Sequence, residues 1–399
     1  MKHCLSVFLL LFGFNNLFGQ YNCESNRFLE EVFNTVDKSA NQAYGQAVNT
    51  TGANQTLLLD VYEPVGDTMQ ARPLIIWAHG GSFVFGDKES SDIVTLCNKY
   101  SKMGYVTASI NYRLGFSGLF PTANSATQTV YRATTDMRAA VRYFYKDALT
   151  TNQFKIDTNN IFVGGVSAGA FIALHLAYLN DENEIPEAVD PLEFGGIEGN
   201  SGNPGYSSKV KAIVNLCGAI GDTSWIGDND IPCLSMHGTN DNVVPYASDV
   251  INVLGIPLFE VDGSASVARR QNNTGTENIF VTWLDAIHTP FISTNAYMDS
   301  VFMAVTPFLA NRLGCNVPLA NNEIEQTEPL VIYPNPASNA VWFETNGKTV
   351  KLRLLDASGR LIFEGISNGQ FDVSLYEKGI YIVQIEELNS LKTARLIIR

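Results

Sequence analysis

Residues 161–178 read Ile-Phe-Val-Gly-Gly-Val-Ser-Ala-Gly-Ala-Phe-Ile-Ala-Leu-His-Leu-Ala-Tyr. This pattern predicts a strand, a tight turn and a helix, and residues 165–169 fit the G-x-S-x-G nucleophile elbow. Only residues without a Cβ let a strand and a helix approach closely around a strained turn, which explains the glycines. Ser167 is therefore a candidate nucleophile beside the free N–H groups of a helix N-terminus. An ordinary glycine-rich turn is the alternative, because the chain holds 32 glycines and the pentapeptide alone is a weak signal.

The flanking sequence alternates between apolar runs and amphipathic stretches. We expect two strands around a turn in 42–61, further strands at 74–78, 105–112, 161–163, 210–216, 232–236 and 279–284, and helices at 92–103, 131–148 and 301–313. Such alternation predicts an α/β fold with a doubly wound, mostly parallel sheet and helices on both faces. Functional residues should then follow the carboxyl ends of the strands.

Two long connections, 113–129 and 180–208, interrupt this alternation. Long connections in a compact domain are usually functional, so we interpret both as walls or a lid of a substrate site. A plain surface insertion explains the second equally well. That second segment is rich in acidic residues, which favours a polar rim.

Composition and the chain start restrict the class of protein. The net charge is −14 and no basic cluster occurs, which disfavours nucleic-acid binding. One lysine followed by the apolar stretch 5–14 predicts a signal peptide over 1–19, with a membrane anchor as the weaker alternative. No later segment reaches 18 apolar residues, so we expect no stable membrane insertion.

Five cysteines follow the predicted signal peptide. Export makes one or two disulfides plausible, but their connectivity cannot be read from the sequence. Cys217 and Cys233 lie in apolar runs and are equally well interpreted as buried free thiols. No C-x-x-C motif or His/Cys cluster indicates a metal site.

The pattern of polar and apolar residues changes near the end of the sequence. We expect a main domain over 20–315, a linker over 316–328 and a small all-β sandwich over 329–399. The last region holds about seven short stretches of alternating polarity separated by turn residues.

A serine nucleophile needs a histidine base and an acid that orients it. On an open α/β sheet these residues follow the serine in the order acid, then histidine. Asp241 and His288 keep that order, and each comes directly after a predicted strand. A turn-capping role for Asp241 and a plain loop position for His288 are the alternatives.

The other histidines fit the base less well. His3 lies in the predicted signal peptide and His79 precedes the serine. His175 is two helical turns beyond the serine on the elbow helix, so we expect a core or surface position. His237 has no equally well placed acid between it and Ser167.

The run His-Gly-Gly-Ser at 79–82 ends another predicted strand. Glycines there let backbone N–H groups face a site without side chains in the way. Two of these amides, with the amide of Ala168, could hold a developing oxyanion.

With these motifs in hand, segment 57–290 resembles the α/β-hydrolase esterases, near the carboxylesterase and acetyl-xylan or feruloyl esterase branches. The resemblance rests on Leu-Asp-Val-Tyr at 59–62, His-Gly-Gly-Ser-Phe at 79–83, Ile-Asn-Tyr-Arg-Leu-Gly at 110–115, the elbow, and Asp-Asn-Val-Val-Pro at 241–245. It implies an α/β-hydrolase fold, serine ester hydrolysis and no cofactor. It also implies that Gly81 and Ser82 supply the upstream oxyanion amides and that His79 is structural. Ser82 departs from the glycine that relatives often carry, but its backbone amide is retained.

Residues 329–399 resemble the C-terminal sorting domain of the type IX secretion system. The resemblance rests on Tyr-Pro-Asn-Pro at 333–336, Leu-Asp-Ala-Ser-Gly-Arg at 355–360 and Gly-Ile-Tyr-Ile-Val at 379–383. It implies the secretion machinery as a partner, and export across a Gram-negative outer membrane. A carbohydrate-binding β-module is the alternative, and such a module would usually expose aromatic residues on one face. The aromatic residues of 329–399 instead mostly fall where strands need core residues.

Together these readings predict a secreted or cell-surface serine esterase that acts through an acyl-enzyme. We expect short acyl esters, or acetyl and feruloyl esters on an acylated polysaccharide, as substrates. A serine peptidase of the same fold and a non-catalytic secreted binding or adhesion protein are the alternatives.

Overall fold

A computed structural model describes residues 21, 23, 26–118, 120–253, 255–315, 330–345, 349–356, 361–387 and 390–399. The chain divides into two compact units on either side of residue 317. The predicted signal peptide and the predicted linker lie outside the described residues. Among the described residues, no helix is long and apolar enough to span a bilayer.

An eight-stranded sheet forms the centre of the first unit, in the order β1-β2-β4-β3-β5-β6-β8-β11. Strands β4, β3, β5, β6, β8 and β11 run parallel to one another, whereas β1 and β2 pair antiparallel at one edge. The strands are β1 Val36–Val48, β2 Asn54–Pro64, β3 Arg72–Ala78, β4 Val106–Ile110, β5 Ile156–Val166, β6 Ala212–Leu216, β8 Cys233–Gly238 and β11 Asn278–Trp283.

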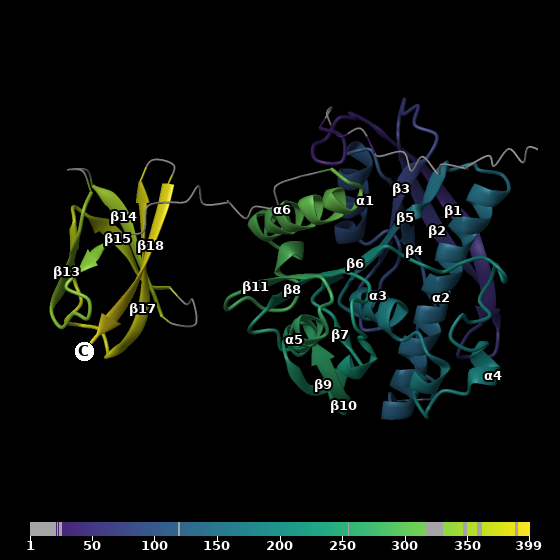
Figure 1. The fold of residues 1–399 in the computed structure, drawn as a ribbon. Helices are drawn as coiled ribbons and strands as arrows, with labels where there is room; N and C mark the ends of the chain where they lie inside the picture. Colours follow the sequence, from purple (N-terminus) through teal and green to yellow (C-terminus); the bar gives the residue numbers. More distant parts are fainter. Residues whose placement is uncertain are drawn as a thin grey trace, which may run out of the picture. The chain divides into compact units, whose positions relative to one another are not determined.

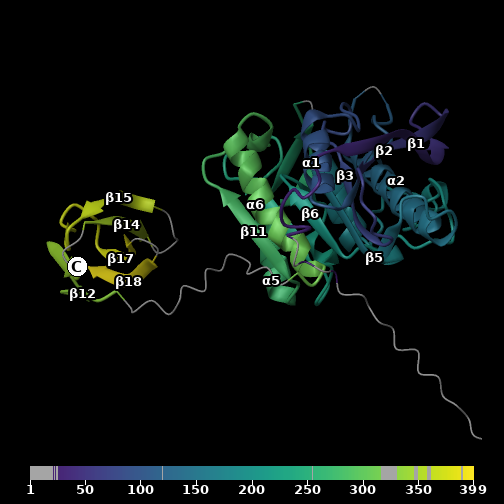
Figure 2. The same cartoon turned by 90° about the horizontal axis from the view of Figure 1, so that it is seen from above.

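Helices cover both faces of this sheet, as Figures 1 and 2 show. One face packs against α2 and α3, and the other against α1 and α6. Strand β3 is buried along its whole length, as its continuous apolar sequence predicts for a strand covered on both sides. The helices are α1 Ser91–Lys102, α2 Ala123–Leu149, α3 Ala168–Tyr178, α4 Pro191–Phe194, α5 Ser264–Thr274 and α6 Asn295–Arg312.

The structure contains elements that the sequence pattern did not predict. Helix α2 begins at Ala123 inside the expected connection 113–129, because Thr122 and Ser125 form a capping box at its start. Helix α5 and a three-stranded sheet in the order β7-β10-β9 were also missed. These strands and the single-turn helices are β7 Ala219–Ile220, β9 Ser248–Val253, β10 Ile256–Gly263, η1 Glu182–Glu184, η2 Thr223–Trp225 and η3 Pro290–Ile292.

One disulfide joins Cys23 to Cys315 and links the two ends of the first unit. Cys97, Cys217 and Cys233 are buried free thiols. Of the two interpretations that the sequence left open for Cys217 and Cys233, the structure therefore has the buried free thiol.

The second unit consists of two antiparallel sheets, in the orders β12-β13-β16 and β15-β14-β17-β18. Its own apolar core includes Val341, Leu352 and Val383. This arrangement is consistent with the predicted small β-sandwich. The strands are β12 Ile332–Tyr333, β13 Ala340–Phe343, β14 Val350–Asp356, β15 Leu361–Ser367, β16 Gln370–Asp372, β17 Gly379–Glu387 and β18 Ser390–Ile398.

Candidate active site

Ser167 occupies the turn between β5 and α3 and has a left-handed backbone, with φ 54° and ψ −117°. Its N–H donates to the carbonyl of Leu216 at 2.9 Å, which holds the strained turn against β6. The two motif glycines are required by close backbone approach. A Cβ on Gly165 would lie 2.2 Å from the backbone of Gly169, and one on Gly169 would lie 2.0 Å from the carbonyl oxygen of Ala78.

The structure brings Ser167, His288 and Asp241 together at the carboxyl edge of the sheet. The Oγ of Ser167 lies 2.9 Å from Nε2 of His288, and Nδ1 of His288 lies 2.6 Å from Oδ2 of Asp241. Asp241 follows β8 and His288 follows β11, so three different strand ends supply the three side chains. The carboxylate is fully buried, whereas the imidazole is 16% exposed and so can be reached from outside.

Asp241 accepts hydrogen bonds on both carboxylate oxygens. Oδ1 accepts from the amides of Val243 and Val244 at 2.9 Å each, and Oδ2 accepts from His288 and from Nε2 of His237 at 3.1 Å. Burial raises the pKa of Asp241, but the hydrogen bonds from the two histidines and the charge of His288 outweigh it and hold that pKa well below its usual value. The carboxylate is therefore ionised throughout the neutral range.

His237 has a supporting position that sequence reasoning missed. Its ring lies between the carboxylate of Asp241 and the hydroxyl of Ser264, with Nδ1 2.7 Å from that oxygen. The ring is fully buried, and it fixes the orientation of the carboxylate through Oδ2, the same oxygen that accepts from His288. The only signal in the sequence was the place of His237 at a strand end, four residues before Asp241.

A buried thiol lies beside these residues. The sulfur of Cys217 is within 4.8 Å of ligand atoms of Asp241 and His288. Burial raises the pKa of Cys217 to about 12, so the thiol stays protonated at neutral pH and packs as a small apolar group.

Of the three predicted oxyanion donors, Ser82 and Ala168 line the same cavity as Ser167, and Gly81 directly precedes Ser82. Gly81 and Ser82 lie in the loop after β3, and Ala168 is the first residue of α3. The amides of Gly81 and Ser82 form no backbone hydrogen bond among the described residues. The amide of Ala168 has no partner within its own helix, as is general for a first helical turn.

The loop after β3 is held by glycine-dependent geometry. Gly81 has φ 116° and Ser82 has φ 53°. A Cβ on Gly81 would lie 2.2 Å from the carbonyl oxygen of Phe85, whereas one on Gly80 would lie 3.3 Å from the Cβ of Ser167. The two glycines therefore serve different purposes: Gly81 allows the loop to turn, and Gly80 allows it to pack against the nucleophile.

His79 stabilises this loop and does not contact the triad residues. Its Nδ1–H donates to the carbonyl of Gly80 at 2.7 Å, and its ring stacks on Tyr112 at 4.4 Å. The hydroxyl of Tyr112 in turn donates to the carbonyl of His79 at 2.8 Å.

One cavity contacts the candidate nucleophile, and a larger one lies next to it. The smaller cavity contacts Ser82, Ser167 and Ala168, and the larger one, of about 240 Å³, is lined by Phe171 and His175 of α3. The two share the lining residues Val130, Phe171 and Phe259. Of the acidic segment 180–208, only Pro186 lines the larger cavity, so its acidic side chains do not form the wall of this space.

The mostly parallel sheet, the strained serine between β5 and α3, and the histidine and aspartate at later strand ends define an α/β-hydrolase fold. Comparisons with known proteins agree with this class. Residues 59–224 match the family model described as BD-FAE. That match ends before Asp241 and His288, so their assignment rests on the geometry given above.

Curated relatives include esterases and lipases. The chain is 32% identical over 163 residues to gut esterase 1 of Caenorhabditis briggsae, covering 41% of this chain and 28% of that protein. It is 30% identical over 207 residues to lipase 2 of Geotrichum candidum, covering 48% and 35% of the two chains. The chain therefore spans only about a third or less of the length of these relatives.

A solved structure of Thermogutta terrifontis esterase 2 phosphoramylated by tabun superposes with a TM-score of 0.51. The sequences are 18% identical, and the superposition covers 70% of this chain and 96% of the other. At this identity the likeness concerns the fold, which it confirms as that of the α/β hydrolases.

Residues 331–399 match the model of the secretion system C-terminal sorting domain. Both resemblances predicted from the sequence, to α/β-hydrolase esterases and to a secretion sorting domain, are thereby confirmed. A sorting domain implies export to the cell surface or beyond it.

Proposed function

We propose that this protein is a secreted serine hydrolase that cleaves carboxylic esters through an acyl-enzyme. The observation that carries the proposal is the continuous hydrogen-bonded path from Ser167 through His288 to Asp241. Its members lie at the distances that proton transfer between nucleophile and base requires. The similarity to esterases and lipases supports the same chemistry.

In the first half-reaction, Ser167 Oγ attacks the ester carbonyl carbon while Nε2 of His288 takes its proton. The ionised Asp241 holds Nδ1–H of the ring and stabilises the imidazolium that forms. The imidazolium then gives its proton to the leaving alkoxide oxygen, and the ester C–O bond breaks. In the second half-reaction, water attacks the acyl-enzyme with His288 again as the base, and the carboxylic acid leaves.

The oxyanion of each tetrahedral intermediate is held by the amides of Gly81, Ser82 and Ala168 in this proposal. Loss of one such donor typically costs about 3–4 kcal/mol of transition-state stabilisation. Because these donors are backbone groups on a strained loop and a helix start, the fold fixes their direction before substrate binds.

The two cavities limit the acyl group. The space at Ser167 is small and borders a second, partly open and largely apolar cavity, which suits short acyl groups or one ring rather than a long flexible chain. We therefore propose acetyl to butyryl esters, or acetyl and feruloyl groups on a polysaccharide, as substrates. Export from a Gram-negative bacterium after signal-peptide removal would bring the enzyme to such polymers.

The test compares purified wild type with Ser167→Ala on p-nitrophenyl acetate and on a peptide substrate. We expect ester hydrolysis that falls by roughly a million-fold in kcat in the variant, and no comparable peptide cleavage. Ser91→Ala is the matched control, since Ser91 is an exposed serine at the start of α1. Residual activity of tens of per cent in Ser167→Ala would remove Ser167 from the mechanism.

A further inference from the structure

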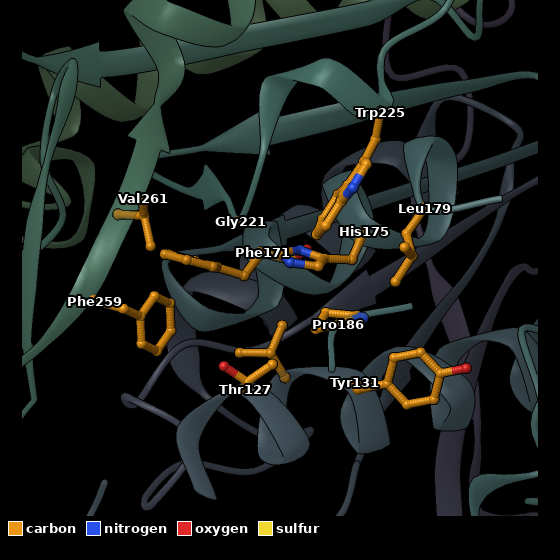
Figure 3. A pocket seen from close by; sticks show the side chains of 11 residues that line it. Thr127, Tyr131, Phe171, His175, Leu179, Pro186, Gly221, Trp225, Phe259 and Val261 are labelled. Carbon is orange, nitrogen blue, oxygen red and sulfur yellow. The ribbon is translucent and has the colours of Figure 1, made fainter. Parts of the chain in front are cut away.

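The larger cavity beside α3 is mostly apolar. Figure 3 shows aromatic and aliphatic side chains around it, with His175 between Phe171 and Trp225. Tyr131 is the other titratable residue in the lining, but its hydroxyl points away and donates to the carbonyl of Gly196 at 2.7 Å. Thr127 also lines the cavity, but its hydroxyl donates to the carbonyl of Ala123 at 3.0 Å. His175 therefore contributes the polar ring to an otherwise mostly apolar lining.

The protonation of His175 follows from its surroundings. Nδ1 lies 2.7 Å from the carbonyl oxygen of Phe171, and because a carbonyl only accepts, Nδ1 carries the proton. Burial lowers the pKa of His175 to about 4, so the ring is neutral at neutral pH. Nε2 then has a free lone pair and acts only as a hydrogen-bond acceptor.

Nε2 lies next to Gly221 in the cavity lining. A Cβ on Gly221 would lie 3.4 Å from Nε2 and 3.0 Å from the ring of Trp225. Glycine thus keeps a gap in front of the acceptor that any other residue would fill. Among the residues that the structure describes, none donates a hydrogen bond to Nε2.

This cavity lies on the acyl side of the candidate nucleophile. The smaller cavity, which contacts Ser167 and shares three lining residues with the larger one, is also lined by Ser82 and Ala168, whose amides would hold the oxyanion, but not by His288. A leaving alcohol must receive its proton from His288 and therefore lies on the other side. The group that enters the cavity is accordingly the acyl part of the ester.

We propose that the cavity binds the far end of the acyl group, and that Nε2 of His175 accepts a hydrogen bond from a hydroxyl carried there. The apolar walls and the parallel rings of Phe171 and His175, with centroids 6.2 Å apart, fit a flat ring. The inference therefore assigns His175 as the residue that selects hydroxyaryl acyl esters over their unsubstituted analogues. It rests on the proposed ester hydrolysis at Ser167.

The experiment uses two esters that differ by one hydroxyl, methyl 3-(4-hydroxyphenyl)propanoate and methyl 3-phenylpropanoate. The readout is the ratio of their kcat/KM values within each enzyme, so that any general loss of activity cancels. We expect wild type to favour the hydroxylated ester about fivefold to tenfold, as one satisfied hydrogen bond in an apolar site allows. His175→Phe, which keeps the stacked ring but lacks the acceptor, should bring the ratio to one or below.

Gly221→Ala is a second, milder variant, because its methyl group fills the gap in front of Nε2 and leaves the imidazole in place. It should lower the ratio in the same direction, and it carries the test if His175→Phe does not fold. The control is Leu192→Ala on α4, whose side chain is 91% exposed and outside the cavity. This control should keep the wild-type ratio.

A wild-type ratio near one, or a ratio that neither variant changes, would overturn the inference. Hydrolysis of p-nitrophenyl acetate without hydrolysis of either aryl ester would also overturn the inference, since the cavity would then not admit an aromatic ring. Absence of all ester hydrolysis would instead reject the proposed function itself, so the two failures are distinguishable.

Discussion

Replacement of Asp241 by asparagine tests the site at its most connected residue. The carboxylate accepts four hydrogen bonds, two from backbone amides on Oδ1 and two from His237 and His288 on Oδ2. Asparagine has one oxygen and one NH₂ group at these places. If its oxygen keeps the two amides, its NH₂ group faces Nδ1 of His288, where a donor would now meet a donor.

The imidazole of His288 must then switch tautomer, so that Nδ1 accepts and Nε2 carries the proton. A protonated Nε2 cannot take the proton of Ser167, and the imidazolium also loses its counter-charge. We expect kcat to fall by about 10⁴, equivalent to about 5.5 kcal/mol of transition-state stabilisation. KM for a small ester should change little, because the Asp241 side chain is fully buried and does not line the two cavities.

The assay is steady-state hydrolysis of p-nitrophenyl acetate by purified wild type and Asp241→Asn, with the thermal unfolding midpoint of each protein measured alongside. Asn240→Asp is a matched control, since it exchanges the same two residue types one position earlier in the same turn. A folded Asp241→Asn protein that retains more than a tenth of wild-type kcat would refute the tautomer argument.

Three further predictions follow from the same structure. Ser82→Gly should keep most of the wild-type activity. Gly81→Ala should lose most of that activity, because the added Cβ would collide with the backbone of the next turn. Equal losses in the two variants in steady-state assays would point to the Ser82 hydroxyl instead. Burial lowers the pKa of His175 to about 4, against about 6.5 in the unfolded chain, so the unfolded state binds more protons between these pH values. Wild type should therefore lose about 3 kcal/mol of stability as the pH falls from 6.5 to 4. His175→Phe should not show this loss, and denaturant unfolding at each pH measures the difference. A chain truncated after Cys315 should hydrolyse esters normally and fail only in export, because the second unit has its own apolar core; an inactive or insoluble product would contradict this.

Local sequence was sufficient for features that depend on neighbouring residues. The elbow could be predicted because the glycines around Ser167 are needed within one turn, and the buried strand β3 because its apolar run is continuous. The order of strands and helices indicated the parallel sheet, since a strand that alternates with helices returns in the same direction. The choice of Asp241 and His288 followed from that topology, which places strand ends at one edge.

Only the tertiary structure decided contacts between segments far apart in the chain. The support of Asp241 by His237, and of His237 by Ser264, joins separate elements through side chains that no local pattern connects. The start of α2 was missed because its first turns are rich in polar residues, and burial against the rest of the domain, rather than apolar periodicity, stabilises them. The polar rim expected from segment 180–208 was an inference from composition, whereas cavity polarity depends on which side chains face inward. The gap in front of His175 exists because Gly221 lies opposite it, and that proximity of residues 46 positions apart is set by packing alone.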